Sequence, residues 1–375
     1  MTVPQTTDLN PIARTLLGPG PSNVHPRVYA ALAQPTIGHL DPYFQTVMDD
    51  VKELLRYGFA TKNDFTVPIS GTGSAGMEAA LANFIEHGDE VLVCVKGYFG
   101  ERIYDMATRY TPNVDRLERP WGEAFDPGDV ATALKAKAYK LVAIVHTETS
   151  TGILQPGIAE IAAAARENGA LMVLDTVASW PGVPVEVDAW GVDIVYSGSQ
   201  KALSAPPGLA PLTINERARE VLRNRKTRVA NWYLDLTALE AYWGGGKRTY
   251  HHTAPVNMIY SLREALRLLA EEGLQDVHTR HRATAEQLWE GLTALGAPPR
   301  APLALRAPTL TTPLIPEGAD DLAVRTALLN EYNIEISGGF GPLAGQIWRI
   351  GLMGHSARKE NVTLLLAALQ EILKR

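Results

Sequence analysis

The chain has 375 residues, of which 46% are hydrophobic and 20% are charged, as in an ordinary globular protein. This length predicts two domains, or one large domain with a smaller one, and a core that needs no disulfide or structural metal. The formal net charge of −6 argues against nucleic acid or an anionic membrane surface as the main partner. The single cysteine, Cys94, excludes an intrachain disulfide and lies in the apolar run 91–95, where we expect a buried, inert thiol.

The N-terminal residues are polar, and we expect residues 1–15 to form an arm rather than a signal peptide, which needs an apolar segment. The sequence has no run of roughly eighteen or more apolar residues, so no membrane-spanning helix is predicted. The last three residues, 373–375, do not form a peroxisomal signal. The expectation is a soluble, cytoplasmic protein.

From residue 65 to residue 215, short apolar runs alternate with amphipathic stretches of helical length. The expected strands are residues 65–69, 90–95, 141–146, 171–175 and 193–196, and the expected helices include residues 75–86 and 158–168. This alternation predicts an α/β fold with a mostly parallel sheet sandwiched by helices. Ligands of such sheets bind beyond the carboxyl ends of the strands. The polar residues that end these runs are therefore the first candidates for a site: Ser70, His146, Asp175 and Ser197.

A glycine-rich, aromatic segment at residues 242–253 interrupts the alternation, and an expected helix at 256–272 follows it. The rest of the sequence predicts helices at 277–295 and 358–373 and strands at 309–315, 334–336 and 346–350. We therefore expect a large domain over residues 16–273 and a smaller C-terminal α+β domain over residues 274–375.

The segment Gly71-Thr-Gly-Ser-Ala-Gly76 matches the dinucleotide-binding pattern G-x-G-x-x-G, between an expected strand and an expected helix. A nicotinamide-binding fold also needs an acidic residue at the end of the second strand, but that strand ends in Lys96-Gly97-Tyr98. The backbone amides of the turn and the hydroxyls of Thr72 and Ser74 can still bind a single phosphate group. A tight turn that binds no ligand is the alternative.

Lys201 follows an expected buried strand, in the segment Ser197-Gly-Ser-Gln-Lys201. Most lysines are solvated on the surface. In an enclosed apolar site the ammonium is destabilised, and the neutral amine can condense with an aldehyde. From this spacing alone, a surface lysine or a phosphate-binding lysine fits equally well.

Asp175 ends the apolar strand expected at residues 171–175, where an unpaired carboxylate is costly. A protonated pyridine nitrogen would suit it, and that pairing makes pyridoxal 5′-phosphate (PLP) an effective electron sink. On its own, Asp175 fits a helix cap equally well. A phosphate-binding turn, a strand-ending Asp175 and, 26 positions later, Lys201 form a much more specific combination.

The sequence resembles the class V, fold-type I PLP-dependent aminotransferases over nearly the whole chain, and among them the alanine–glyoxylate and serine–pyruvate aminotransferases. The matching segments, in order, are Leu17-Gly-Pro-Gly-Pro-Ser-Asn23, Ser70-Gly-Thr-Gly73, Glu148-Thr-Ser-Thr-Gly152, Asp175-Thr-Val-Ala-Ser179, Tyr196-Ser-Gly-Ser-Gln-Lys201-Ala202, Ala205-Pro-Pro-Gly208, Tyr250-His-His-Thr253, Tyr260-Ser-Leu-Arg-Glu264 and Trp348-Arg-Ile-Gly351. The resemblance implies a large PLP-binding domain with a smaller C-terminal domain.

The resemblance also implies a role for each matching residue. Lys201 would carry PLP as a Schiff base and, once released, act as general base, while Asp175 would pair with the pyridinium nitrogen. Ser150 would hydrogen-bond the phenolic oxygen of the cofactor. Arg349 would bind the substrate carboxylate as a bidentate fork, although by its position alone it fits an ordinary surface ion pair better.

Two further sets of residues follow from the resemblance. The residues placed at the phosphate of PLP are Thr72, Gly73 and Gln200 and, from the neighbouring subunit, Tyr250 and Thr253. The residues that would help to line the substrate site are Pro21, Ser22 and Asn23, and Ser150 is expected at the substrate as well as at the cofactor. A homodimer whose active sites are shared between subunits is therefore implied.

Two positions differ from the pattern of relatives. Phe99 stands where many relatives stack a tryptophan on the cofactor, and a phenyl ring can still stack, with less area and no N–H. Ser74 stands where close animal relatives have a histidine, which weakens inference about the substrate but not about the cofactor. Three histidines lack the spacing with a carboxylate that metal ligands show, so we interpret them as structural or interface residues and expect no metal site: His146, His251 and His252.

The implied reaction is ping-pong transfer of an amino group from a small amino acid, alanine or serine, to a small 2-oxo acid, glyoxylate or pyruvate.

Class V aminotransferases that act on ureidoglycine, aminoethylphosphonate or aspartate are rival assignments within the family. A cysteine desulfurase would need a mobile loop cysteine, whereas Cys94 is expected in a core strand. Two functions outside this chemistry are a nicotinamide oxidoreductase and a non-catalytic protein of the same fold. The joint presence of Lys201, Asp175 and Arg349 argues against a non-catalytic protein.

Overall fold

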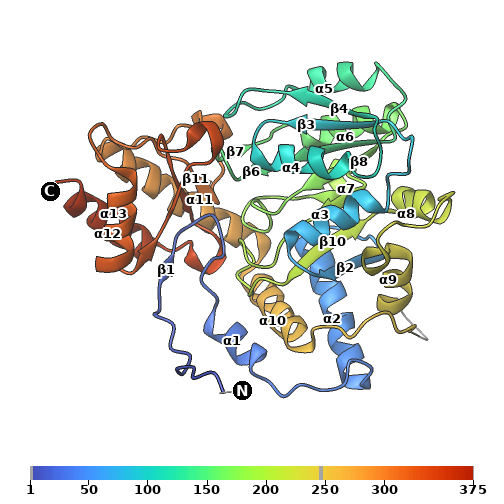
Figure 1. Cartoon of the computed structure of the whole chain (residues 1–375), viewed down its shortest axis with the longest axis horizontal. Coiled ribbons are helices and arrows are strands. Elements are labelled where there is room, and N and C mark those ends of the chain that lie inside the picture. Colours follow the sequence, from blue (N-terminus) through green and yellow to red (C-terminus); the bar gives the residue numbers. More distant parts are fainter. Residues whose placement is uncertain (1–2, 245–247, 375) are drawn as a thin grey trace.

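The computed structural model describes residues 3–244 and 248–374. Residues 1–2 of the expected arm, residues 245–247 of the glycine-rich segment and residue 375 lie outside the described residues. Figure 1 shows the C-terminal elements gathered beside a large sheet, with the N-terminal segment running alongside them.

The large sheet has seven strands in the order β2-β10-β9-β8-β5-β3-β4. In chain order they are β2 (Phe65–Ser70), β3 (Val91–Val95), β4 (Val114–Glu118), β5 (Leu141–Val145), β8 (Leu171–Asp175), β9 (Ile194–Tyr196) and β10 (Leu209–Ile214). Strand β10 is antiparallel to both of its neighbours, and the remaining pairs are all parallel. The predicted mostly parallel α/β sheet is therefore confirmed.

The sequence pattern does not predict two of these strands. Strand β4 lies at the edge of the sheet and is only partly buried, so charged residues interrupt its apolar pattern. Strand β10 is apolar but contains Pro211, and proline removes a backbone donor from a sheet. In the observed register Pro211 lies opposite Pro68 of β2, so the two residues that lack an N–H share one position of the ladder.

Helices surround the sheet and build most of the C-terminal part. They are α1 (Pro26–Leu32), α2 (Pro42–Gly58), α3 (Gly73–Ala82), α4 (Tyr98–Ala107), α5 (Pro127–Leu134), α6 (Ile158–Glu167), α7 (Val187–Trp190), α8 (Glu216–Arg223), α9 (Leu236–Trp243), α10 (Val256–Glu272), α11 (Leu274–Ala294), α12 (Asp321–Glu331) and α13 (Lys359–Ile372). Helices α2 and α5 begin with a proline after a capping aspartate, Asp41 and Asp126, whose side chains accept a backbone N–H. Within residues 3–244 and 248–374, no helix is both long and apolar enough to cross a membrane.

The C-terminal residues form a helix-and-sheet unit. Its antiparallel sheet has the order β11-β14-β13, with β11 (Leu310–Thr311), β13 (Ser337–Gly338) and β14 (Trp348–Gly351). Two other pairs are short: β6 (Thr147–Glu148) with β7 (Ile153–Leu154), and β1 (Thr15–Leu16) with β12 (Ile334–Glu335). Because β1 pairs with β12 and Leu17 packs in the same apolar cluster as Trp348, the segment around residue 16 is attached to the C-terminal unit. The division of the chain at residue 273 stays a proposal, and only Gly273 separates α10 from α11 there.

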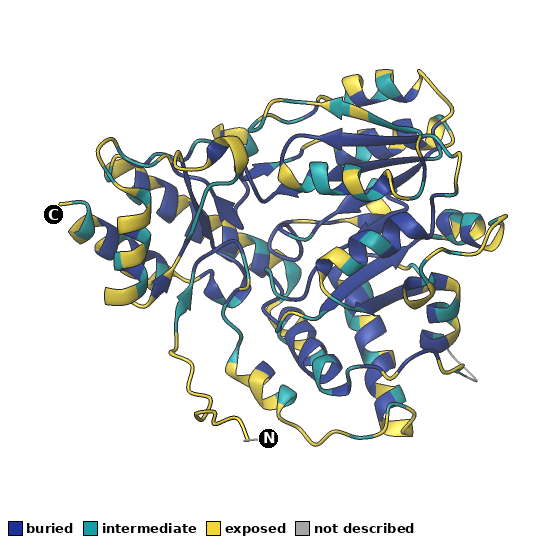
Figure 2. Cartoon of the chain, in the orientation of Figure 1, coloured by how far each residue is buried: buried dark blue, intermediate teal, exposed yellow. Residues whose placement is uncertain are grey.

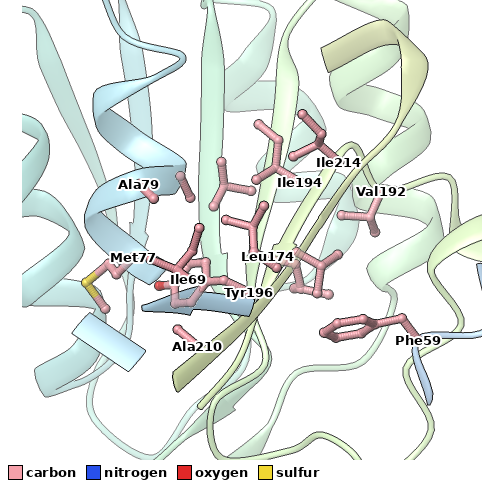
Figure 3. Close-up of a cluster of buried hydrophobic side chains, with 14 of the residues drawn as sticks. Phe59, Ile69, Met77, Ala79, Leu174, Val192, Ile194, Tyr196, Ala210 and Ile214 are labelled. Carbon is pink, nitrogen blue, oxygen red and sulfur yellow. The ribbon is translucent and has the colours of Figure 1, made fainter. Parts of the chain in front are cut away.

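The hydrophobic core lies around the large sheet, whose strands are buried except for β4 and for Ser70 at the end of β2 (Figure 2). Figure 3 shows one part of it, where side chains from β2, β8, β9, β10 and α3 meet: Ile69, Leu174, Ile194, Tyr196, Ala210 and Met77. Cys94 is fully buried in β3, as predicted. This core fixes the carboxyl ends of β8 and β9, at which the candidate site is built.

Candidate active site

The turn between β2 and α3 carries the expected phosphate-binding residues. Thr72 is the N-cap of α3 and its side chain makes no capping hydrogen bond, while Gly73 begins the helix. A Cβ at Gly73 would lie 3.3 Å from Val177, so this backbone packs closely against the segment after β8. The Ser74 hydroxyl accepts a 3.2 Å hydrogen bond from Arg102. The helix N-terminus and the guanidinium together make this turn suitable for an anion.

Gln200 has a side chain whose hydrogen bonding is incomplete. Its amide oxygen Oε1 is buried and has no hydrogen-bond partner among the residues that the structure describes. Leaving a buried polar atom unpaired costs about 1–3 kcal/mol. A ligand that paired with this amide would remove that cost.

Asp175 ends β8 and is 2% exposed. Its Oδ1 accepts the N–H of Val177 at 2.8 Å, and its Oδ2 accepts the hydroxyl of Tyr196 at 2.7 Å. Burial raises the pKa of Asp175 to about 6, with Glu148 acting in the same direction, while the two hydrogen bonds and Lys201 oppose the shift. A cation bound next to Asp175 would therefore stabilise its ionised form.

Lys201 lies in the turn after β9, and its Nζ donates a hydrogen bond to the backbone oxygen of Pro19. A Cβ at Gly20 would lie 2.7 Å from Nζ, and the φ of Gly20 is +101°, so this close approach requires glycine. Burial lowers the pKa of Lys201 to about 8, with Arg349 acting in the same direction and Asp175 opposing it. A neutral, nucleophilic amine is thus accessible close to neutral pH.

Ser150 follows β6 and is fully buried. Its Oγ donates a 2.7 Å hydrogen bond to Oε1 of Glu148 and accepts the N–H of Tyr98 at 3.0 Å. Glu148, also fully buried, accepts the N–H groups of Phe99 and Gly100 in the first turn of α4. This network ties Ser150 to the start of the helix that carries the half-buried ring of Phe99.

Arg349 lies on β14, is 5% exposed, and donates from Nε to the backbone oxygen of Gly338 at 2.7 Å. Its guanidinium carbon is 3.7 Å from the ring centroid of Phe340, whose ring lies 5.1 Å from that of Tyr98. Burial lowers the pKa of Arg349 to about 10. No carboxylate of the described chain forms an ion pair with it. A buried, unpaired guanidinium is suited to bind a carboxylate from a ligand.

The segment Pro21-Ser22-Asn23 is hydrogen-bonded through Ser22 to the turn that carries Lys201. Ser22 donates from Oγ to the backbone oxygen of Lys201 at 2.7 Å and from its N–H to that of Gln200 at 2.9 Å. Asn23 accepts the N–H of Leu16 and donates to the backbone oxygen of Arg14. These side chains brace the backbone, so any direct contact with a substrate would come from the chain near Pro21.

Tyr250 and Thr253 are not joined by a hydrogen bond to the β2–α3 turn within the described part of this chain. Tyr250 is 57% exposed and its ring lies 5.3 Å from that of His39, and Thr253 is exposed as well. Between them, His252 bonds Ser70 through Nε2 at 2.7 Å.

The histidines make contacts within the protein. His146 shares a 3.0 Å hydrogen bond with Ser179, and burial lowers its pKa to about 3. His251 and His252 share one of 2.9 Å between their Nδ1 atoms. The structural or interface role of all three stays a prediction.

Sequence reasoning missed two side chains at this site: Arg102 and Phe340. Arg102 lies three residues after Phe99 on α4, and its guanidinium carbon is 4.8 Å from that ring centroid. Phe340 reaches Arg349 only through the tertiary structure, so no sequence signal could have found it.

Comparison with known proteins gives consistent matches along the chain. The family model for class V aminotransferases matches residues 23–362. The (S)-ureidoglycine–glyoxylate transaminase of Bacillus subtilis is 42% identical, covering 96% of this chain and 91% of that protein. The alanine–glyoxylate aminotransferase of Drosophila melanogaster is 40% identical, covering 96% and 93%. The solved structure of alanine–glyoxylate aminotransferase from Nostoc sp. has a TM-score of 0.96 and 50% identity, covering 98% and 97%.

The fold, with an aspartate buried at the end of β8 and a lysine in the turn after the neighbouring parallel strand β9, is that of the fold-type I aminotransferases. The chain belongs to the class V aminotransferase family. Both conclusions confirm the fold and the family predicted from the sequence.

Proposed function

We propose that the chain binds PLP on Lys201 and transfers an amino group from alanine or serine to glyoxylate or pyruvate, as a cytoplasmic homodimer. The observation that carries this proposal is geometric: Asp175 ends β8, Lys201 lies in the turn after the neighbouring parallel strand β9, and Nζ of Lys201 is held against Pro19 and Gly20. Asp175 raises the pKa of Lys201 and Lys201 lowers that of Asp175, while Arg349 lowers the pKa of Lys201. Asp175 and Arg349 therefore act in opposite directions on the charge of Lys201.

The donor set of this place fits PLP. The N-terminus of α3 and the Thr72 hydroxyl suit the phosphate, and the unpaired amide of Gln200 can turn its NH2 group to donate there. Asp175 offers a carboxylate to a pyridinium nitrogen, Phe99 a ring face and Ser150 an oxygen beside the phenolic group. When bound, PLP supplies an electron sink for the charge that develops on the α-carbon of the donor.

The chain's own residues would do the remaining work. Lys201 would hold the cofactor covalently and, when displaced by the donor, its Nζ would remove the α-proton and return it to the product. Asp175 would keep a proton on the ring nitrogen. Pro19 and Gly20, which lie against Nζ, would limit the access of water to this amine.

Arg349→Ala is expected to raise KM for both the amino acid and the 2-oxo acid at least about 30-fold, because losing a buried charge-assisted pair costs about 2 kcal/mol or more. Steady-state kinetics with alanine and glyoxylate measure this. Arg109→Ala, at an exposed arginine, is the control. An unchanged KM for both substrates in Arg349→Ala would contradict the assignment of the carboxylate site.

The surroundings of Arg349 favour a small donor. Phe340 covers the guanidinium of Arg349, and the rings of Phe340 and Tyr98 lie 5.1 Å apart. These two aromatic side chains leave less space for a large donor beside Arg349. Relatives of about 40% identity are named for alanine–glyoxylate and (S)-ureidoglycine–glyoxylate reactions, which makes ureidoglycine the main alternative donor.

A panel of donors tests the substrate assignment. Alanine, serine, aspartate, aminoethylphosphonate and ureidoglycine are each assayed with glyoxylate and with pyruvate. We expect the highest kcat/KM for alanine or serine with glyoxylate. A higher kcat/KM for ureidoglycine would replace the proposed donor, and no transfer from any amino donor would overturn the proposed function.

Large exposed aromatic residues near Tyr250 support a shared active site. Trp232 is 67% exposed and Tyr233 42%, and such aromatic residues are common in the cores of interfaces. We propose that Tyr250 and Thr253 reach the phosphate in the partner subunit, as the resemblance implies.

Mixing two inactive variants tests this arrangement. If Tyr250 acts across a two-fold interface, a mixed dimer of Lys201→Ala and Tyr250→Ala subunits has one intact site and one site with both defects. Random exchange makes half of the dimers mixed, so about a quarter of the wild-type activity should return. If activity stays at the level of the unmixed variants although subunits exchange, Tyr250 acts within its own subunit and the proposal is wrong.

A cysteine desulfurase is not supported. Cys94 is fully buried, and burial raises the pKa of its thiol to about 12. A reactive thiolate on a mobile loop is therefore absent at this position. The solved NifS-like protein from Rickettsia africae is 18% identical to this chain, which shows a shared fold alone.

A further inference from the structure

Arg102 is a partly buried arginine on α4 that the proposed reaction does not use. Its Nη1 donates a 3.2 Å hydrogen bond to Oγ of Ser74, and its guanidinium carbon lies 4.8 Å from the ring centroid of Phe99. Ser74 is in the first turn of α3, directly after Thr72 and Gly73. One cationic side chain therefore joins the expected phosphate-binding turn to the ring that is expected against the cofactor.

The charge of Arg102 is not paired with a carboxylate in residues 3–244 and 248–374. The two acids near it on α4 are paired with other arginines, Glu101 with Arg116 at 2.7 Å and Asp105 with Arg109 at 3.0 Å. The contacts of Arg102 are a neutral hydroxyl and two aromatic rings. These contacts hold the guanidinium in place without neutralising it, so its charge is available to an anion.

The unpaired amide of Gln200 lies beside the same turn. A Cβ at Gly73 would lie 3.8 Å from Cα of Gly198, and a Cβ at Gly198 would lie 2.9 Å from Oε1 of Gln200. That oxygen is buried and has no hydrogen-bond partner among the described residues. The start of α3 and the amide of Gln200 therefore border one place, and Arg102 reaches its edge through Ser74.

The phosphate of PLP needs a positive charge that the groups so far assigned to it do not bring. A phosphate monoester carries roughly −1.5 to −2 charges at pH 7. The side chains expected at the phosphate are all neutral: Thr72, Gln200 and the partner's Tyr250 and Thr253. His252, which bonds Ser70 just before the turn, stays neutral because burial lowers its pKa to about 4. Arg102 is the cation that contacts this turn in the described part of the chain.

We propose that Arg102 binds the phosphate of PLP and supplies the positive charge that balances it, with its guanidinium anchored on Ser74. The inference rests on the proposed PLP site. Guanidinium groups suit phosphate because their N–H groups form a rigid fork. Arg102 uses one N–H for Ser74, and its other guanidinium N–H groups make no hydrogen bond with the described residues. Close animal relatives have a histidine at position 74, whereas in this chain the cation at the turn comes from α4.

A purely structural role is the alternative for Arg102. Its contact with the ring of Phe99 could serve only to orient that ring. A residue that orients the ring affects every ligand that stacks on it, with or without a phosphate. A residue that balances the phosphate affects only ligands that carry one. Ligands with and without the phosphate therefore distinguish the two roles.

The test compares PLP with pyridoxal, which has the same ring and aldehyde but no phosphate. Both dissociation constants are measured on the cofactor-free protein from the visible absorption of the bound ligand. We expect Arg102→Met to raise Kd for PLP at least about 10-fold and to leave Kd for pyridoxal nearly unchanged. Arg102→Lys keeps the charge and should recover part of the affinity for PLP. Arg109→Met, at an exposed arginine just after α4, should change neither.

Two results would overturn the proposal: an unchanged Kd for PLP in Arg102→Met, or equal weakening of PLP and pyridoxal. The Phe99→Leu background provides a further control. Arg102→Met should weaken PLP by a similar factor in the wild type and in Phe99→Leu, and a factor that disappears in Phe99→Leu would show that Arg102 acts only through the ring. The urea midpoint of each variant is compared with that of the wild type, and Arg102→Gln replaces Arg102→Met if the latter does not fold.

Inorganic phosphate gives a readout that needs neither the ring nor the aldehyde. As a competitor of PLP uptake by the cofactor-free protein, it should be weaker in Arg102→Met than in the wild type. If the wild type binds no PLP, the proposed function fails, and calorimetric titration with inorganic phosphate still decides the role of Arg102. Binding to the wild type that is lost in Arg102→Met would support an anion-binding role. No binding to the wild type, or equal binding to both proteins, would overturn it.

Discussion

The Lys201→Ala variant is expected to lose covalently bound PLP and at least about 10³-fold of kcat, the largest effect that we predict. Lys201 would be both the attachment point and the group that moves the α-proton, so one substitution removes both contributions. The measurements are the visible absorption of the purified protein after incubation with PLP and the transaminase rate with alanine and glyoxylate. A variant that keeps the visible band and its activity would contradict the role of Lys201.

Two further variants separate chemistry from folding. Lys62→Ala removes an exposed lysine and should keep the band and the rate of the wild type. Lys201→Arg keeps a long cationic side chain in the turn that Ser22 and Pro19 contact, and it should be as inactive as Lys201→Ala. If Lys201→Arg unfolds like the wild type and is inactive, the loss is chemical.

The same lysine sets a pH dependence for cofactor uptake. Only the neutral amine attacks the aldehyde of PLP, and burial lowers the pKa of Lys201 to about 8. The rate at which the cofactor-free protein takes up PLP should therefore rise with pH and level off above about 8. Because Asp175 raises the pKa of Lys201, removing the charge of Asp175 should move this midpoint to lower pH. A flat profile between pH 6 and pH 9 would contradict the lowered pKa (these limits lie roughly one to two units either side of the midpoint).

The Asp175→Asn variant is expected to bind PLP on Lys201 but to lose about 10²–10³-fold of kcat. Asparagine fills the same space and still accepts the N–H of Val177, but it brings no charge to the ring nitrogen. Without that charge the ring is a weaker electron sink, so the proton transfer at the α-carbon slows while substrate binding changes little. Single-turnover measurement of the half-reaction with alanine separates these two steps.

Tyr196→Phe provides a graded comparison for Asp175. It removes the 2.7 Å hydrogen bond to Oδ2 and leaves the carboxylate in place. Because that bond lowers the pKa of Asp175, its loss should raise the pKa further and move the acid limb of the kcat profile to higher pH. The rate at the optimum should fall much less than in Asp175→Asn. If Asp175→Asn keeps the full rate, Asp175 has no role at the ring nitrogen.

The strands that could be predicted from the sequence are those whose two faces are both buried. Strands β5 and β8 agree with the predicted runs within a residue, since parallel strands covered by helices are almost continuously apolar. Asp175 stands out for the same reason, because a charged residue at the end of such a strand is unusual. Strand β4 does not follow this pattern. It lies at the edge of the sheet, where its residues are only partly buried, and three of its five residues are charged.

Contacts between distant segments could not be predicted from the sequence. The pairing of β1 with β12 joins residues 15–16 to residues 334–335, and two-residue strands leave no periodicity to detect. The contact of Phe340 with Arg349 also depends on how the chain folds back. For Ser22 and Asn23 the resemblance implies a substrate-lining role, whereas their side chains bond the backbone of residues 14–16 and 200–201.

The central claim is that PLP is bound covalently to Lys201. The most direct test is to incubate the purified wild type with PLP, reduce it with borohydride and map the modified peptide by mass spectrometry. We predict that the visible band disappears on reduction and that one pyridoxyl group per chain is found on Lys201. A protein that stays colourless with added PLP, or a label spread over surface lysines with Lys201 unmodified, would contradict the account.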